Sequence, residues 1–215
     1  LLVELSTEFH TSVAMVGQLI GATAITWGIT APLAGPVSDA YGRRPMLLTG
    51  LLLMALGILG SVLAWSYGSL LAFRLLTGVG AAMVPPNSIA TVADIFPPEG
   101  RGKAIGWLAS ASGVSAALGV AIVALLLDLG GWKMPFYVIG TLLLILWVLL
   151  WVWLPRSQRQ PGRSLAFFSH YREVGSNVTF WYLLAANSLQ RMVFFAVFGY
   201  LAAHLIQTFN IKAGE

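Results

Sequence analysis

Six long apolar stretches alternate with short polar segments along this chain. They cover approximately residues 13–37, 45–65, 69–95, 103–127, 134–154 and 178–206. A bilayer core is about 30 Å thick, so a spanning helix needs about 20 mostly apolar residues. Every stretch meets that length, and none shows the alternating polarity of a β-barrel strand. The pattern predicts an all-α fold, a polytopic transmembrane helix bundle with six spans visible.

The composition supports a membrane protein over a soluble one. The chain has 215 residues, of which 58% are hydrophobic and only 9% are charged. A soluble domain usually carries about 25% charged residues, because it must cover its surface with groups that water solvates. The chain contains no cysteine, which excludes disulfides and thiolate metal sites.

The distribution of basic residues predicts the orientation. Positive residues mark cytoplasmic loops, so we place one set of helix ends in the cytoplasm and both ends of this chain outside. The net charge of +4 therefore reflects membrane topology, and we expect no nucleic-acid partner. Only Lys133 and Lys212 fall in the opposite loops, whereas the cytoplasmic set comprises Arg43, Arg44, Arg101, Lys103, Arg156, Arg159, Arg163 and Arg172.

One connection is longer than the others and divides the chain. Residues 155–176 are polar and basic, and we interpret them as a cytoplasmic linker. Residues 1–154 then form an N-terminal half bundle, and residues 177–215 supply the first helix of a second half.

Small residues recur at helical spacing along two of the predicted spans. In lipid, small faces allow helix backbones to approach closely, so we expect both stripes to be tightly packed. The first stripe is Gly17, Gly21, Ala24, Gly28, Ala31 and Gly35, and the second is Gly106, Ser110, Gly113 and Ala117.

The first inside loop carries the most specific motif. Residues 35–45 read GPVSDAYGRRP. This resembles the loop signature G-x-x-x-D-x-x-G-R-[RK] of the major facilitator superfamily, which joins helices two and three. We expect Gly35 to permit close packing at the helix end, and Gly42 to permit a tight turn. Asp39 can accept helix N-terminal amides of a neighbouring half, while Arg43 and Arg44 lie at the headgroup level.

Three further segments resemble the same family. Residues 74–82, RLLTGVGAA, are similar to its helix-four pattern, and residues 94–104, DIFPPEGRGKA, to its connection between helices four and five. Residues 131–136, GWKMPF, are similar to its start of helix six. The resemblance implies that this chain is a fragment covering helices two to seven of twelve, with residues 1–12 matching the outside loop after helix one.

One signature of a subfamily is missing. Drug–proton antiporters of this family carry a Gly-Pro pair in helix five, but residues 113–121 contain no proline. The departure weakens the drug-antiporter subtype and leaves the superfamily resemblance intact.

The loop motif also predicts an inner gate. Asp39, Arg43 and Asp94 should form one charge cluster at the cytoplasmic ends of helices two and four. The resemblance implies that such a cluster latches one half of the protein to the other in the outward-facing state. The alternative is simple topological anchoring by basic residues.

Two arginines fall within the predicted spans. A midplane arginine is costly, so it usually faces the bundle interior and is paired. Arg191 shares a polar-aromatic face with Asn187, Gln190 and Phe194, which predicts either a substrate-cavity wall or a structural hydrogen-bond network. Arg74 either contributes to the cavity or to proton coupling, as the resemblance implies, or extends toward the outer headgroups.

These observations favour secondary active transport of a small solute by alternating access, with efflux of a small organic molecule as the leading hypothesis. A non-transporting membrane receptor or assembly protein on the same fold is the alternative. We expect no enzyme activity, no cofactor and no metal, because no catalytic constellation or ligand spacing appears. The expected partners are the lipid bilayer, a small-molecule substrate and protons as a candidate coupling ion, and the expected location is a bacterial-type plasma membrane.

Overall fold

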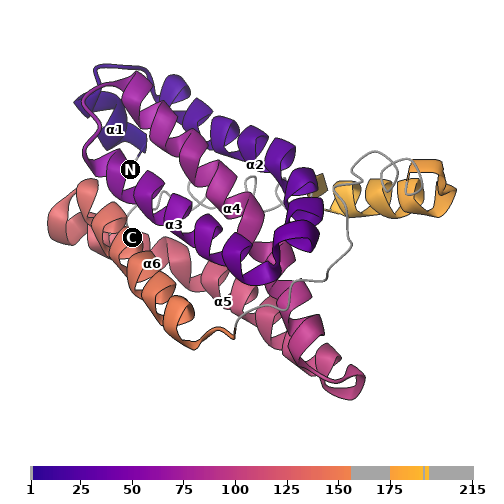
Figure 1. Ribbon diagram of the computed structural model, residues 1–215. Helices are drawn as coiled ribbons and strands as arrows, with labels where there is room; N and C mark the ends of the chain where they lie inside the picture. Colours follow the sequence, from indigo (N-terminus) through magenta and orange to yellow (C-terminus); the bar gives the residue numbers. More distant parts are fainter. Residues whose placement is uncertain (1, 156–174, 191, 194–215) are drawn as a thin grey trace. The chain divides into compact units, whose positions relative to one another are not determined.

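The structure, a computed structural model, describes residues 2–155, 175–190 and 192–193. The chain divides into two compact units, residues Leu1–Leu165 and Ala166–Glu215. Residues 178–190 of the second unit are helical. Six helices of the first unit are shown in Figure 1: α1 (Leu2–Glu8), α2 (Val13–Tyr41), α3 (Arg43–Val62), α4 (Tyr67–Ile95), α5 (Pro98–Gly130) and α6 (Lys133–Trp153).

The first five predicted spans are confirmed. Helices α2 to α6 are each long and apolar enough to cross a membrane. Much of the sixth predicted span, 178–206, lies outside the described residues, as do residues 156–174 of the predicted linker. The domain boundaries therefore stay a prediction. The segment 1–12, which was predicted to match the outside loop after helix one, contains the short helix α1.

Local sequence signals explain where the helices begin and turn. The Ser12 hydroxyl accepts a hydrogen bond from the Met15 amide at the start of α2, and Ser66 forms a capping box with Ser69 at the start of α4. These side chains satisfy amides that have no partner within the helix. Helix α5 begins with Pro98, where a missing N–H costs nothing.

Helix α4 is the centre of the first unit. It packs against α2 on one side and α3 on the other, and α3 also packs against α6. The close contacts are made by glycines: a Cβ on Gly80 would lie 2.5 Å from the Gly50 carbonyl oxygen, and one on Gly78 would lie 2.7 Å from the Thr23 carbonyl oxygen. Small residues thus bring these backbones together, as expected where the hydrophobic effect cannot drive helix association.

The predicted tight packing of the two small-residue stripes was wrong for the described part of the chain. A Cβ added to any glycine of either stripe would meet nothing within 4 Å. The stripe periodicity identified a helix face correctly, but it could not say which face meets a neighbouring helix. The glycines concerned are Gly17, Gly21, Gly28, Gly35, Gly106 and Gly113.

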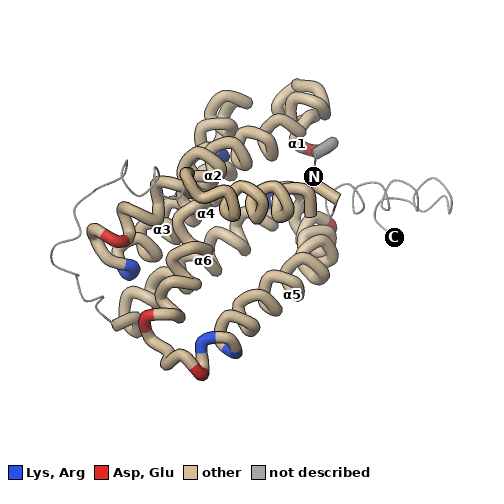
Figure 2. The backbone as a smooth tube through the Cα atoms, turned by 90° about the vertical axis from the view of Figure 1, so that its right-hand side faces the viewer, with Lys and Arg blue, Asp and Glu red and all other residues tan. Residues whose placement is uncertain are grey.

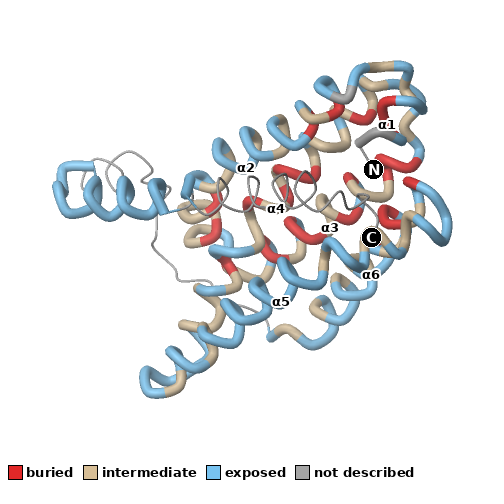
Figure 3. Tube along the Cα trace, turned by 180° about the vertical axis from the view of Figure 1, so that it is seen from behind, coloured by how far each residue is buried: buried red, intermediate tan, exposed pale blue. Residues whose placement is uncertain are grey.

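Helix α5 buries none of its residues, although it is strongly apolar. Figure 3 shows its exposed surface along most of its length. An apolar helix of this kind is stable only in lipid or against further helices. The exposed apolar surface of the unit is consistent with a bilayer around it.

Charged residues of the unit lie mostly near the helix ends, as Figure 2 shows. One side of the unit, which we call the basic side, is formed by the C-terminal ends of α2 and α4 and the N-terminal ends of α3 and α5. Arg43, Arg44, Arg101 and Lys103 lie there. An aromatic and aliphatic core, which includes Leu70, Trp132 and Phe136, lies at the opposite end. This arrangement places the loop motif at one membrane surface.

Candidate functional site: a charge cluster at the basic end

A single glycine joins α2 to α3. Gly42 has φ 100° and ψ 156°, and its amide donates to the Ser38 carbonyl oxygen at 2.8 Å. Side chains disfavour positive φ, whereas glycine adopts it at little steric cost. The predicted tight turn at Gly42 is confirmed, and it sets the start of α3 directly beside the end of α2.

That turn brings together the three predicted charges. Arg43 Nη1 pairs with Asp39 Oδ1, four residues earlier in the chain and on the other side of the turn. Arg43 Nε lies 3.5 Å from Asp94 Oδ2, which comes from the end of α4. The predicted contact of Asp39, Arg43 and Asp94 is therefore confirmed. We call these three residues the charge cluster.

Two buried polar residues, Ser38 and Asn87, connect the charge cluster to the interior of the unit by hydrogen bonds. Arg43 Nη1 donates to Ser38 Oγ at 3.1 Å, and the Ser38 hydroxyl donates to Asn87 Oδ1. The Asn87 amide nitrogen donates to the Met83 carbonyl oxygen at 2.6 Å. Ser38 and Asn87 are almost fully buried, so these hydrogen bonds orient Arg43 from a low-dielectric interior.

Sequence reasoning missed Ser38 and Asn87. A signal existed for Asn87, because an amide inside an apolar span needs an interhelical or backbone partner. Ser38 is adjacent to Asp39 in the loop motif, but nothing local indicates that it faces α4.

The electrostatics explain why α3 tolerates Arg43 in its first turn. The N-terminus of a helix carries a partial positive charge, which disfavours cations there. Asp39 and Asp94 compensate for Arg43. Both carboxylates are partly exposed, with side-chain accessibilities of 37% and 57%. Each ion pair is therefore partly solvated and contributes about 1 kcal/mol or less to the stability of the folded protein.

The other two loop-motif residues behave differently. Arg44 Nη2 donates to the Trp151 carbonyl oxygen in the last turn of α6, and so points away from the charge cluster. The predicted close packing at Gly35 was wrong within the described residues, since a Cβ there would meet nothing.

Arg74 has an aromatic partner that its sequence context did not indicate. Its guanidinium carbon lies 4.6 Å from the centre of the Phe136 ring, at the start of α6. Its neighbours Thr77 and Gly78 are buried, Thr77 beside Gly57 of α3 and Gly78 beside Thr23 of α2. A cation over an aromatic face is favourable by about 0.5–1 kcal/mol where the pair is exposed and by about 2 kcal/mol where it is desolvated, and Arg74 is partly exposed. A cavity role for Arg74 stays a prediction.

The second predicted cavity surface belongs to the other unit. Asn187 and Gln190 are exposed on the helical segment 178–190. Arg191 and Phe194 lie outside the described residues, so the predicted cavity wall of all four residues stays a prediction.

Membrane-length helices and a charged turn at one end define a polytopic membrane protein. The family model described as the Major Facilitator Superfamily matches residues 1–214. The chain belongs to this superfamily, a family of membrane transporters rather than enzymes.

Similar proteins agree with this assignment. The chain is 28% identical over 212 residues to an uncharacterized MFS-type transporter, YceJ, of Bacillus subtilis (strain 168), covering 98% of this chain and 54% of that protein. It is 34% identical to Multidrug resistance protein 3 of the same organism, over 50% of this chain and 21% of that protein. It is 35% identical to the 3-(3-hydroxy-phenyl)propionate transporter of Escherichia coli (strain K12), over 62% of this chain and 33% of that protein.

A solved structure shows the same fold. It is the crystal structure of a bacterial homolog to the human lysosomal transporter Spinster, in an inward-facing and unoccupied conformation. The TM-score is 0.60 at 21% identity, over 90% of this chain and 48% of that chain. This chain spans about half the length of the YceJ transporter and of the chain in this crystal structure.

Proposed function

We propose that this chain is part of a secondary transporter that moves a small organic molecule across a bacterial plasma membrane by alternating access, in the direction of efflux. The observation that carries this proposal is the superfamily match over residues 1–214, joined to the charge cluster at the basic end. Similarity to a protein named for multidrug resistance supports an organic substrate and export. The bacterial relatives support the location.

The charge cluster acts as the cytoplasmic gate in this proposal. Its three residues come from one unit, from the end of α2, the start of α3 and the end of α4. In the proposal they latch this half of the transporter to the other half in the outward-facing state, and the latch is released when the cytoplasmic side opens. Each ion pair is weak because it is partly solvated. Weak contacts suit an element that must form and break once in every transport cycle. Protons are the proposed coupling ion.

A second substrate class has its own support. The similarity to the 3-(3-hydroxy-phenyl)propionate transporter favours an aromatic carboxylate. Arg191, if it faces the cavity, would supply a guanidinium group that can bind a carboxylate in a bidentate manner.

Transport in proteoliposomes tests both candidates. The full-length protein is reconstituted with an imposed pH gradient and supplied with either the cationic dye Hoechst 33342 or radiolabelled 3-phenylpropionate. We expect gradient-dependent movement of one probe, beyond that in protein-free liposomes. Movement of the dye alone supports the organic-efflux assignment, and movement of 3-phenylpropionate alone supports the aromatic-acid assignment. Movement of neither probe contradicts both.

A further inference from the structure

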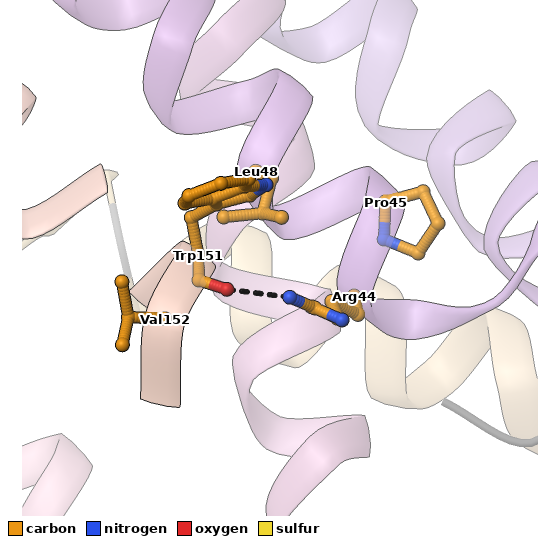
Figure 4. A pocket seen from close by; sticks show the side chains of 5 residues that line it. All are labelled: Arg44, Pro45, Leu48, Trp151 and Val152. Carbon is orange, nitrogen blue, oxygen red and sulfur yellow. Dashed lines mark hydrogen bonds between the residues drawn. The ribbon is translucent and has the colours of Figure 1, made fainter. Parts of the chain in front are cut away.

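A second site lies on the basic side, away from the charge cluster. A pocket of about 580 Å³ is formed where the first turn of α3 meets the last turn of α6. It is shown in Figure 4 and is lined by Arg44, Pro45, Leu48, Trp151 and Val152. All five residues belong to the first unit, and α3 packs directly against α6.

The Arg44 side chain lines this pocket, and one of its N–H donors has no hydrogen-bond acceptor among the described residues. Its Nη2 donates to the Trp151 carbonyl oxygen, as Figure 4 shows. Its Nε is buried and has no acceptor among the described residues. The neighbouring Arg43 has two carboxylate partners, whereas no carboxylate pairs with Arg44 in the described part of the chain. A buried donor without an acceptor is costly.

A second donor in the same region also lacks an acceptor. The indole nitrogen of Trp147 is buried and unpaired among the described residues. The Trp147 ring stacks on that of Trp151, with centroids 6.5 Å apart. Arginine and tryptophan side chains donate hydrogen bonds and cannot accept them. Trp147 does not line the pocket, so the requirement on a ligand comes from Arg44, whose positive charge and free donor call for an anion with acceptor oxygens.

The rest of the pocket is apolar and faces the surroundings of the bundle. Trp151 and Val152 are 57% and 61% exposed, and Leu48 lies beside them. The pocket is at the basic ends of two spans, where headgroups meet acyl chains and where tryptophan is enriched. A free phosphate ion would leave these apolar walls in contact with water, whereas a phospholipid covers them with its glycerol and acyl groups.

The sequence that directly follows α6 is basic. The sequence continues from α6 into residues 155–172, which contain Arg156, Arg159, Arg163 and Arg172 and no acidic residue. Basic clusters beside a spanning helix attract anionic lipid by about 1 kcal/mol for each residue near the surface.

We propose that the pocket of Arg44, Leu48, Trp151 and Val152 binds the phosphate of an anionic phospholipid, such as phosphatidylglycerol, in the leaflet that contacts the basic loops. The Arg44 guanidinium donates to the phosphate oxygens, and Leu48, Trp151 and Val152 contact the upper acyl chains. By holding Arg44 and the end of α6 together, the lipid stabilises the contact between α3 and α6. This inference does not depend on which solute is transported.

Native mass spectrometry of the full-length protein tests this site. The protein is released from nanodiscs that contain equal amounts of phosphatidylglycerol and phosphatidylcholine with identical acyl chains. We expect retained phosphatidylglycerol to exceed phosphatidylcholine at least about fivefold, the ratio that corresponds to about 1 kcal/mol. Arg44→Gln should remove this preference. Arg101→Gln is the matched control on the same membrane side and should keep it.

A second pair of variants keeps Arg44 in place. Val152→Glu puts a carboxylate at an exposed position of the pocket and should displace the lipid from Arg44. Trp153→Glu adds the same charge at the next residue, which does not line the pocket, and should retain the lipid. An excess of inorganic phosphate should fail to reduce the bound phosphatidylglycerol.

Three results would overturn the proposal. The first is equal retention of the two lipids by the wild-type protein, which would mean that water satisfies Arg44. The second is an equal loss of preference in Arg101→Gln or Trp153→Glu, which would indicate attraction without a site. The third is displacement of the lipid by inorganic phosphate, which would identify an anion site without lipid selectivity.

Discussion

The indole nitrogen of Trp27 lies 3.2 Å from the carbonyl oxygen of Ala81, so a side chain of α2 donates a hydrogen bond to the backbone of α4. In a regular helix that carbonyl accepts from the amide four residues later, but residue 85 is proline and has no N–H. Trp27 therefore supplies the donor that Pro85 lacks. Backbone groups inside a membrane must be satisfied within the protein, and this contact does so between two helices.

This hydrogen bond predicts that the destabilisation caused by Trp27→Phe depends on whether residue 85 is proline. Trp27→Phe should destabilise the protein by about 1 kcal/mol, the size of an interhelical hydrogen bond in a membrane. In a Pro85→Ala background the restored amide can bond to Ala81, so the same substitution should cost clearly less. Unfolding of the four variants in mixed micelles measures the coupling. Equal costs in both backgrounds would show that Trp27 acts through packing alone.

The turn between α2 and α3 predicts a position-specific effect of alanine. Gly42→Ala should destabilise the protein by about 1–2 kcal/mol, because a Cβ at φ 100° is strained. Gly102→Ala in α5 is the matched control, since its Cβ would meet nothing and its helix would gain propensity. Thermal denaturation in detergent compares the two. A Gly42→Ala variant as stable as the control would contradict the turn geometry.

The bias of basic residues predicts the membrane orientation. Single cysteines at Gly42 and Gly102 should react only with permeant reagents in intact cells, whereas cysteines at Gly68 and Gly130 should react with impermeant ones. The sequence contains no native cysteine to interfere. Labelling of residue 42 by an impermeant reagent from outside would reverse the topology.

Arg191 carries the prediction about the second half of the substrate cavity. Arg191→Ala should insert normally and lose transport, and Arg191→Lys should recover little, because lysine lacks the planar fork that binds a carboxylate. Uptake by proteoliposomes at matched protein content measures this. Full transport by the alanine variant would remove Arg191 from the mechanism.

The charge cluster could be predicted because its geometry follows from local rules. Asp39 and Arg43 are four residues apart, and Gly42 allows the turn between them. Asp94 lies at the end of a second span that runs in the same direction as α2, so the chain topology returns it to the same membrane surface. The resemblance of the loop motif to the family signature indicated this cluster, and the residue spacing and the order of the spans agree with it.

The lateral contacts of the helices could not be predicted in the same way. Arg74 lies over Phe136, and Ser38 bonds to Asn87, because particular helix faces meet. Hydrophobic periodicity is weak in a membrane span, since lipid-facing and protein-facing residues are both apolar. The stripe of small residues that includes Gly35 is an example. Its periodicity was recognised, but among the described residues no neighbouring helix packs against its glycines.

Transport by Asp39→Asn, measured together with stability, tests the proposed gate most directly. The full-length wild-type protein, Asp39→Asn and the control Glu99→Gln, an exposed acid at the start of α5, are compared in proteoliposomes at equal insertion. The account predicts that Asp39→Asn lowers turnover about tenfold or more while changing unfolding by about 1 kcal/mol or less, and that Glu99→Gln leaves both unchanged. Wild-type turnover in Asp39→Asn would contradict the gate.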